Sequence, residues 1–404
     1  MNSRVWSVMT VLVVVSLALV ASGCGRTTPE PKAEPEAKIG EPYKIGAMFA
    51  ITGRASTLGI PGRNSLQMRH KELEAAGGIM GPDGLMHPIE LIIYDTESDE
   101  TKAVLATKKL IEEDQVCAII GPNQSGTSLA VLDSVQNAGV SLISIGASGK
   151  IIEPAAERKW IFKTPRHGRL LVRKALEYLK GQGITKAAWL SINNAFGDSG
   201  KVEFEALAPD FGITIVASEK FEAADTDTTA QLTKIRGTDA EMLVIWAILP
   251  GGAIVTKNAF DLGLEIPILN HPAAVIPGFI GLATAQAAEG VLSVGEKLAV
   301  AEQLPDSDPE KDLLMKYLAD YRAAYDAESA MMGADAYDAF NLVVRAMEKA
   351  GPDRAAIRDE LEKTQGFMGL TGVYNMSPSD HNGQDMDALV VMQIVNGEYK
   401  LVEP

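Results

Sequence analysis

The residues best suited to chemistry lie in two junctions rich in glycine and hydroxyl groups. The first junction spans residues 119–128 and reads Ile-Ile-Gly-Pro-Asn-Gln-Ser-Gly-Thr-Ser. The second spans residues 142–149 and reads Leu-Ile-Ser-Ile-Gly-Ala-Ser-Gly. In both, an apolar run typical of a buried strand passes into residues that favour the start of a helix. Unpaired backbone N–H groups and hydroxyls at such a place can hold an anion such as a carboxylate.

Neither junction is a phosphate-binding loop, because the Lys-Ser or Lys-Thr pair that would follow its last glycine is missing. Ordinary helix capping accounts for either junction taken alone. Two in succession on neighbouring strands favour a binding role, since the carboxyl ends of parallel strands meet at one edge of a sheet.

The other reactive residue types show no catalytic pattern. The histidines are scattered and have no metal-ligand spacing such as His-Glu-x-x-His, and no Gly-x-Ser-x-Gly motif is present. Cys117 lies within an apolar run, so we expect a buried, unreactive thiol. The sequence therefore predicts no enzyme, no cofactor and no metal site. The five histidines are His70, His87, His167, His271 and His381.

The charge of the chain excludes one class of partner. The formal net charge is −16 over 404 residues, and no basic stripe occurs. Proteins that bind nucleic acid need clustered Lys and Arg against the phosphates. We therefore expect no nucleic acid partner.

The elements that position the junctions follow from the alternation of short apolar runs with amphipathic stretches. This alternation predicts an α/β fold of parallel sheets covered by helices, and seven or more strands fit two doubly wound lobes better than one. Ligands then bind in a cleft beyond the carboxyl ends of the strands. The expected strands are 43–49, 89–94, 116–120, 140–145, 187–192, 213–217 and 242–248, and the expected helices include 65–76, 101–114 and 334–350.

The N-terminal segment has the features of a targeting signal. Residues 1–23 combine Arg4, an apolar run and a small-residue end, which is typical of a secretory signal peptide. Cys24 follows directly, as in a bacterial lipobox, and its sulfur is the expected lipidation site; an uncleaved anchor helix is the alternative. Residues 24–42 alternate proline with charge and are expected to form a disordered tether. The folded part is thus expected in the periplasm or at the cell surface, tethered to the membrane.

Several stretches resemble the type I periplasmic binding proteins, the leucine/isoleucine/valine-binding family. Their order and spacing from about Tyr43 to the C-terminus make the resemblance specific. The matching stretches are 44–48 (Lys-Ile-Gly-Ala-Met), 51–53 (Ile-Thr-Gly), 74–81 (Glu-Ala-Ala-Gly-Gly-Ile-Met-Gly), 91–95 (Leu-Ile-Ile-Tyr-Asp), 120–122 (Ile-Gly-Pro), 225–232 (Asp-Thr-Asp-Thr-Thr-Ala-Gln-Leu) and 336–339 (Ala-Tyr-Asp-Ala).

The resemblance implies two doubly wound lobes, joined by three crossovers, that close over a ligand like a hinge. Lobe 1 would comprise residues 43–162 and 292–366, and lobe 2 residues 163–291 and 367–404. The implied function is that of a monomeric substrate-binding protein that delivers a small solute to the permease of an ABC importer. A ligand-sensing regulator of the same fold, acting through a partner protein, is the alternative.

The resemblance also implies the pocket. Ser125 on the first junction, with Gly146, Ala147 and Ser148 on the second, would hold a ligand's carboxylate and ammonium. Phe196 supplies an aromatic wall.

Three departures change the expected ligand. Leu58 replaces a family tyrosine, and Ile248 falls where the family has an aromatic residue. No carboxylate lies near 270–274, where the family has an acid for the ligand's ammonium. His271 is a candidate polar end instead. The expected ligand is a small carboxylate with an apolar body: a branched-chain or other apolar amino acid, or a branched or aromatic acid.

Overall fold

The computed structural model describes residues 38–273, 276, 278–329 and 331–403. The expected signal peptide, Cys24 and the tether up to residue 37 lie outside the described residues. The rest of the expected tether is ordered, because Gly40 N–H donates to the Met86 carbonyl at 2.8 Å and Met86 N–H donates to the Lys38 carbonyl at 2.9 Å. The prediction of a disordered segment was therefore wrong for residues 38–42.

The first lobe is built on a parallel five-stranded sheet in the order β4-β1-β5-β6-β7. The strands β5 and β6 are buried at every residue, which explains their unbroken apolar sequence. The bounds are β1 (Tyr43–Phe49), β4 (Ile89–Asp95), β5 (Ala118–Ile120), β6 (Ser141–Ser144) and β7 (Ile161–Lys163).

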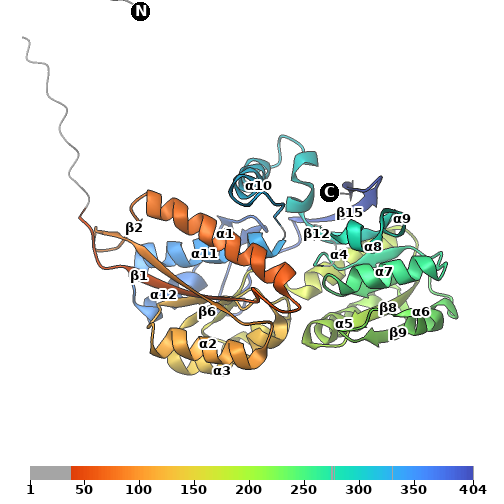
Figure 1. The fold of residues 1–404 in the computed structure, drawn as a ribbon, viewed down its shortest axis with the longest axis horizontal. Coiled ribbons are helices and arrows are strands. Elements are labelled where there is room, and N and C mark those ends of the chain that lie inside the picture. The colour runs from red at the N-terminus through yellow and green to blue at the C-terminus, as the bar shows by residue number, and fades with distance from the viewer. Residues whose placement is uncertain (1–37, 274–275, 277, 330, 404) are drawn as a thin grey trace, which may run out of the picture. The chain divides into compact units, whose positions relative to one another are not determined.

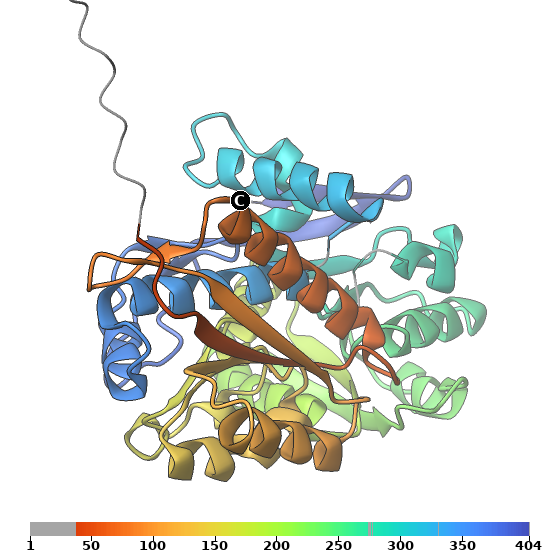
Figure 2. The same ribbon diagram turned by 60° about the vertical axis from the view of Figure 1, so that its left-hand side comes forward.

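Helices cover both faces of this sheet (Figure 1; Figure 2). On one face lie α1 (Ser56–Ala75) and α11 (Met331–Ala350), which pack against each other; on the other lie α2 (Glu100–Glu112) and α3 (Ser125–Ala138). In the helix expected over 334–350, Phe340, Val344 and Met347 recur at helical spacing, and all three are buried on α11. The helix α12 (Arg354–Glu362) packs beside α11.

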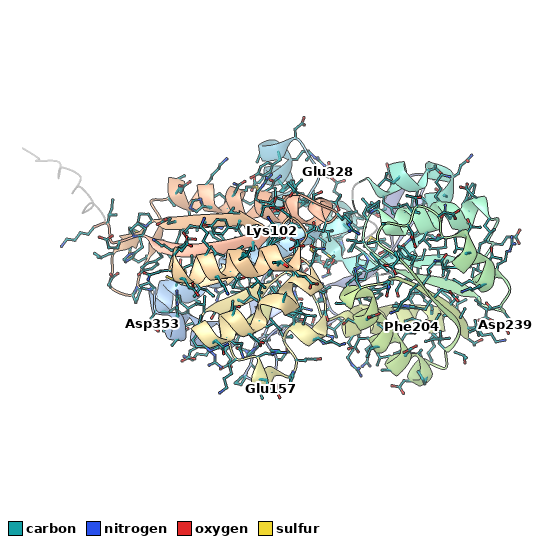
Figure 3. All side chains as sticks on the ribbon, turned by 60° about the horizontal axis from the view of Figure 1, so that its bottom comes forward. Lys102, Glu157, Phe204, Asp239, Glu328 and Asp353 are labelled. Carbon is teal, nitrogen blue, oxygen red and sulfur yellow. The ribbon has the colours of Figure 1, made fainter. Side chains whose placement is uncertain are left out.

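The second lobe has a seven-stranded sheet in the order β16-β15-β12-β11-β10-β8-β9. Five strands are parallel, and the hairpin β15–β16 continues the sheet in antiparallel pairing. Figure 3 places Phe204 inside this lobe and the charged Asp239 on its surface. The bounds are β8 (Lys186–Ile192), β9 (Thr214–Phe221), β10 (Met242–Trp246), β11 (Ile268–Asn270), β12 (Leu292–Glu296), β15 (Leu389–Val395) and β16 (Glu398–Glu403).

Helices also line the second sheet. The helices α4 (Gly168–Gly181) and α5 (Ala195–Leu207) pack together, while α7 (Gly251–Asp261) packs with α6 (Thr229–Arg236), α8 (Phe279–Ala283) and α9 (Ala285–Ala288). Two-stranded pairs complete the fold: β2 (Ile79–Met80) with β3 (Met86–His87), and β13 (Phe367–Met368) with β14 (Val373–Tyr374). The helix α10 (Lys311–Tyr325) packs on the 3-10 segment η4 (Lys297–Gln303).

Two of the expected lobe boundaries differ from the structure. Residues 292–296 were assigned to lobe 1, but they form β12, which pairs with β11 and β15 in the second sheet. Residues 367–383 were assigned to lobe 2, but they bond to the first lobe: Asp338 of α11 accepts from the N–H of Leu370, and Met376 N–H donates to Thr364. In both cases, hydrogen bonds to residues distant in the sequence determine the lobe to which the segment belongs.

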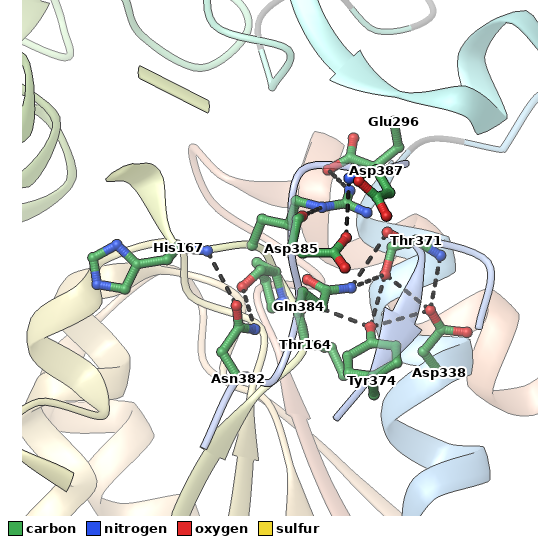
Figure 4. Close-up of polar contacts among 12 residues, drawn as sticks. Thr164, His167, Glu296, Asp338, Thr371, Tyr374, Asn382, Gln384, Asp385 and Asp387 are labelled. Atoms are coloured by element: carbon green, nitrogen blue, oxygen red, sulfur yellow. Dashed lines mark hydrogen bonds and ion pairs between the residues drawn. The ribbon is translucent and has the colours of Figure 1, made fainter. Parts of the chain in front are cut away.

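Three chain segments pass between the two sheets side by side. They are the links after β7, after β12 and before β15. The Asn382 side chain joins two of them, since its Nδ2 donates to the carbonyls of Lys163 at 3.0 Å and Pro165 at 3.1 Å (Figure 4). The third joins through Lys297 N–H, which donates to the Ala388 carbonyl at 3.2 Å.

Candidate ligand-binding site

A cavity of about 160 Å³ lies where the strand ends of both lobes meet. Six of the eight residues predicted for the pocket line it: Leu58, Ser125, Ala147, Phe196, Ile248 and His271. Gly146 and Ser148 do not. A cavity of this size suits a small solute rather than a polymer or a large cofactor.

The first junction forms one end of the cavity. Gly121 follows β5 with φ 88°, and a Cβ at this position would lie 2.1 Å from the Met48 carbonyl oxygen, so only glycine fits. The next turn brings in Asn123, whose Oδ1 accepts from Ala50 N–H at 2.7 Å. Its Nδ2 is buried and has no hydrogen-bond partner among the described residues. A buried amide without a partner is costly, so this N–H₂ is available to an acceptor in the cavity.

Ser125 opens α3 beside Asn123. No side chain caps this helix, so the N–H groups of its first turn remain free for an anion. Ser125 is 4% exposed, and its Oγ accepts from Ser148 N–H at 3.2 Å. No bond donated by its hydroxyl is found in the described part of the chain, so the hydroxyl can donate to a ligand. The bond also ties the two junctions together, as expected for neighbouring strands, because β5 pairs with β6.

The second junction differs from its prediction. No α-helix follows β6; a 3-10 turn over Gly149–Ile151 takes its place. The N–H of Gly146 donates to Ser144 Oγ at 2.9 Å, so it is not free. The Ser148 hydroxyl is buried and unpaired within the described residues, and Ser148 is not among the residues that line the cavity. Of this junction, Ile145 and Ala147 line the cavity.

The Ala147 carbonyl already has a partner inside the protein. The amine of Lys163, at the end of β7, donates to it at 2.7 Å and to the Arg166 carbonyl at 3.3 Å. Lys163 is fully buried, and this burial lowers its pKa to about 7. The sequence placed Lys163 near a crossover but gave it no role.

The second-lobe wall is apolar and aromatic. Asn194 caps α5 by accepting from the N–H groups of Phe196 at 3.1 Å and Gly197 at 3.0 Å, which fixes the place of the Phe196 ring. Behind it lies Trp246, with ring centroids 5.8 Å apart. Ile248 completes this wall, while Leu58 contributes from α1 of the first lobe.

His271 is the polar group of the second-lobe wall. Its Nδ1 accepts from Ala273 N–H at 3.1 Å, so the ring proton resides on Nε2. The ring packs edge-on against Phe196 and Trp246, at centroid distances of 4.9 Å and 4.3 Å. Burial lowers the pKa of His271 to about 3, so the ring is neutral at physiological pH. Its Nε2–H is buried and finds no partner in the described ranges.

A buried ion pair that the sequence did not predict also lines the cavity. Arg166 Nη1 lies 3.5 Å from Glu296 Oε1, and both side chains are less than a tenth exposed. Burial raises the pKa of Glu296, and the guanidinium opposes this shift only in part. Gly372 allows the arginine to pass, since a Cβ there would lie 2.3 Å from Arg166 Nη2. The sequence showed no carboxylate near 270–274, and the structure brings Glu296 to the cavity from β12 instead.

A larger cavity of about 750 Å³ lies between η4, α10 and the β15–β16 hairpin. Exposed charged side chains form much of its lining, among them Glu302, Arg322 and Lys400. It reaches the end of β12 at Gly295 and Glu296, but its described lining residues include none of the buried unpaired donors of the smaller cavity, which is therefore the better candidate site.

Metal-binding side chains and the free thiol are the remaining candidates for reactive chemistry. No group of His, Cys, Asp and Glu side chains able to hold a metal ion occurs among the described residues. Cys117 is buried, and burial raises the pKa of its thiol, as expected for an unreactive cysteine.

The sequence profile of the periplasmic binding protein family matches residues 42–398. The chain belongs to this family. This periplasmic binding protein is 23% identical to the leucine-, isoleucine-, valine-, threonine- and alanine-binding protein of Pseudomonas aeruginosa over 361 residues, which cover 88% of this chain and 86% of the relative. It is also 23% identical to the Leu/Ile/Val-binding protein BraC3 of Rhizobium johnstonii, covering 76% of this chain and 79% of that protein.

The comparison with solved structures also finds binding proteins of this fold. The branched-chain amino acid transporter substrate-binding protein LivJ of Streptococcus pneumoniae, in complex with isoleucine, has a TM-score of 0.77 and 26% identity, covering 90% of this chain and all of that one. An extracellular ligand-binding receptor of Rhodopseudomonas palustris has a TM-score of 0.80 and 25% identity, covering 89% and 99%.

The family confirms the predicted two-lobed fold and a ligand-binding, non-enzymatic role. Its members are periplasmic or extracellular binding proteins. Within the described part of this periplasmic binding protein, no helix has the length and apolarity needed to span a bilayer.

Proposed function

We propose that this periplasmic binding protein captures a small carboxylate with an apolar body between its two lobes and delivers it to the permease of an ABC importer. The observation that carries the proposal is the cavity itself: at the first junction Asn123 Nδ2 is a buried donor and Gln124 Oε1 a buried acceptor without partners in the described residues, and both residues line the cavity together with the apolar second-lobe wall. A carboxylate at Ser125 and the first turn of α3 would take up those donors, and the body would lie against Phe196, Ile248 and Leu58. The candidate ligands are apolar amino acids and branched or aromatic acids.

The names of the relatives support the importer. The compared proteins include binding proteins for leucine, isoleucine and valine and a transporter's substrate-binding protein. The three links between the sheets support a hinge, since closure of two lobes over a ligand needs only small changes at a few linking residues. We propose that the chain acts as a monomer in this role.

Anchoring belongs to the same proposal. A secretory signal over residues 1–23 and a lipidated Cys24 would hold the binding lobes at the outer side of a membrane. Replacing Cys24 by Ser should move the exported protein from the membrane fraction to the soluble fraction. Equal membrane retention of the variant would contradict lipidation.

The test of the binding function is a thermal-shift and calorimetry screen over apolar amino acids and over branched and aromatic acids. A true ligand at about a hundredfold excess over its Kd should stabilise the protein by about 2.7 kcal/mol. Ser125→Ala should then weaken that ligand by about 1–3 kcal/mol, because a buried carboxylate loses a donor.

The matched control is Ser134→Ala, on the same helix but outside the cavity lining, which should leave the Kd unchanged. Equal affinity of the Ser125 variant and the control would remove Ser125 from the site.

A further inference from the structure

The ammonium group of an amino acid finds its acceptor at the second junction already taken. Ile145 and Ala147 of this junction line the cavity, and the Ala147 carbonyl accepts from the Lys163 amine at 2.7 Å. Lys163 thus occupies, from inside the protein, the place where a ligand's ammonium would bond. A ligand ammonium would have to share this carbonyl with the Lys163 amine, and it would meet a like charge in a buried setting whenever that amine is protonated.

The lobe-two side of the cavity offers a donor rather than an acceptor. Since Nδ1 of His271 accepts from Ala273 N–H, its Nε2 carries the proton and stays unpaired in the described part of the chain. His271 is 2% exposed, so water does not readily satisfy this N–H. An ammonium group has no lone pair to accept such a bond, whereas a carbonyl or hydroxyl oxygen does.

Two carboxylates line the cavity, and neither is well placed for an ammonium. Glu296 already faces the Arg166 guanidinium at 3.5 Å. Because Arg166 Nη1 is the ion-pair partner of Glu296 Oε1, the charge of this carboxylate is already matched inside the protein. Glu100 is exposed, so its attraction for a ligand cation is screened by water.

We infer that the cavity selects carboxylates whose second polar group accepts hydrogen bonds, such as branched or aromatic 2-oxo acids, over the corresponding amino acids. The carboxylate lies at Ser125 and Asn123, and the 2-oxo oxygen accepts from His271 Nε2–H. The inference rests on the proposed function, since it specifies the solute of that same cavity.

The experiment compares three solutes that share one carbon skeleton: 4-methyl-2-oxopentanoate, L-leucine and 4-methylpentanoate. Calorimetry on the mature protein should give a Kd for the 2-oxo acid that is about tenfold or more below the Kd of the other two. The same order is expected for phenylpyruvate, phenylalanine and 3-phenylpropanoate.

Two variants test the role of His271. His271→Phe keeps the aromatic packing but removes the donor, so the preference for the 2-oxo acid over 4-methylpentanoate should fall to about parity. His271→Gln carries an amide N–H₂ near the position of Nε2 and should restore much of the preference. Melting curves of both variants show whether each is folded, and the ratio of two Kd values on one folded variant does not depend on its stability.

The outcomes separate the two levels of the argument. Leucine binding as tightly as its 2-oxo analogue would overturn this inference and leave the proposed function standing. Failure of every amino acid and carboxylate to bind would overturn both. A preference for the 2-oxo acid that persists in His271→Phe would overturn the assignment of the oxo group to His271.

Discussion

Buried polar groups behave differently in two neighbouring regions of this protein. In the crossover network, defined as Thr164, Asp338, Thr371, Tyr374, Asn382 and Gln384, side chains bond to one another and to the linking backbone (Figure 4). Asp338 alone accepts from the N–H of Leu370, from the N–H and hydroxyl of Thr371, and from the Tyr374 hydroxyl. In the cavity wall, Asn123 Nδ2 and His271 Nε2 have no partner among the described residues.

This comparison separates buried polar groups that contribute to stability from those that contribute to binding. The bonded groups of the network hold the links between the lobes in place, although Gln384 Oε1 has no partner among the described residues, and we propose that the unsatisfied donors of the cavity serve a solute. Changes in the network should therefore affect stability most, and changes in the wall should affect affinity most.

The largest effect is expected from Asp338→Ala. The substitution removes the common acceptor of several buried donors, and we expect the free energy of unfolding to fall by about 3–5 kcal/mol. Urea unfolding measures this free energy. Asp320→Ala is the control, because Asp320 forms an exposed i,i+4 ion pair with Lys316, and such pairs contribute little to stability. A loss of stability no greater than that of Asp320→Ala would contradict the stabilising role given to the crossover network.

A pH-dependent effect is expected from Lys163. Its pKa is lowered to about 7 in the folded protein and returns to its ordinary value of 10.5 on unfolding. Between these values the unfolded chain binds more protons, so stability rises with pH there and carries the full penalty below pH 7. Relative to Lys163→Met, the wild-type free energy of unfolding should rise by about 1 kcal/mol per pH unit above pH 7. Parallel curves for the two proteins would show that the amine is not desolvated.

The smallest effect is expected from Ser148→Ala, which sharpens the comparison. The Ser148 hydroxyl is buried and unpaired in the described part of the chain, but it lies outside the cavity lining. Removing it should change ligand affinity by less than about 0.5 kcal/mol, in contrast to Ser125→Ala. A loss as large as that of Ser125→Ala would return Ser148 to the site, where the family resemblance had placed it.

The sequence predicted well what local pattern determines. Strands such as β1 and β8 are apolar runs, the first junction is marked by Gly121 and Ser125, and the helix over 334–350 shows its core stripe directly. Six of the eight predicted pocket residues reach the cavity, because the end of a strand and the start of a helix fix their positions.

The rest depends on contacts between distant segments. Lys163 ends β7, Arg166 lies in the link that follows, and Glu296 ends β12, and none of these positions shows its partner in the local sequence. The pair of Arg166 with Glu296 joins residues 130 apart, from 296 minus 166. Gly146 and Ser148 do not line the cavity: their N–H groups donate to Ser144 Oγ and Ser125 Oγ, and a 3-10 turn follows in place of the expected helix. No local pattern encodes such a turn.

The bond from Ser148 N–H to Ser125 Oγ joins two parts of the same lobe, so the proposed carboxylate-binding end does not depend on contacts from the other lobe for its shape. A solute can therefore land on the first lobe at a rate set by diffusion and charge, while the aromatic wall governs how long it stays. Changes at Phe196 should accordingly shorten the residence time of the complex and leave the association rate nearly constant.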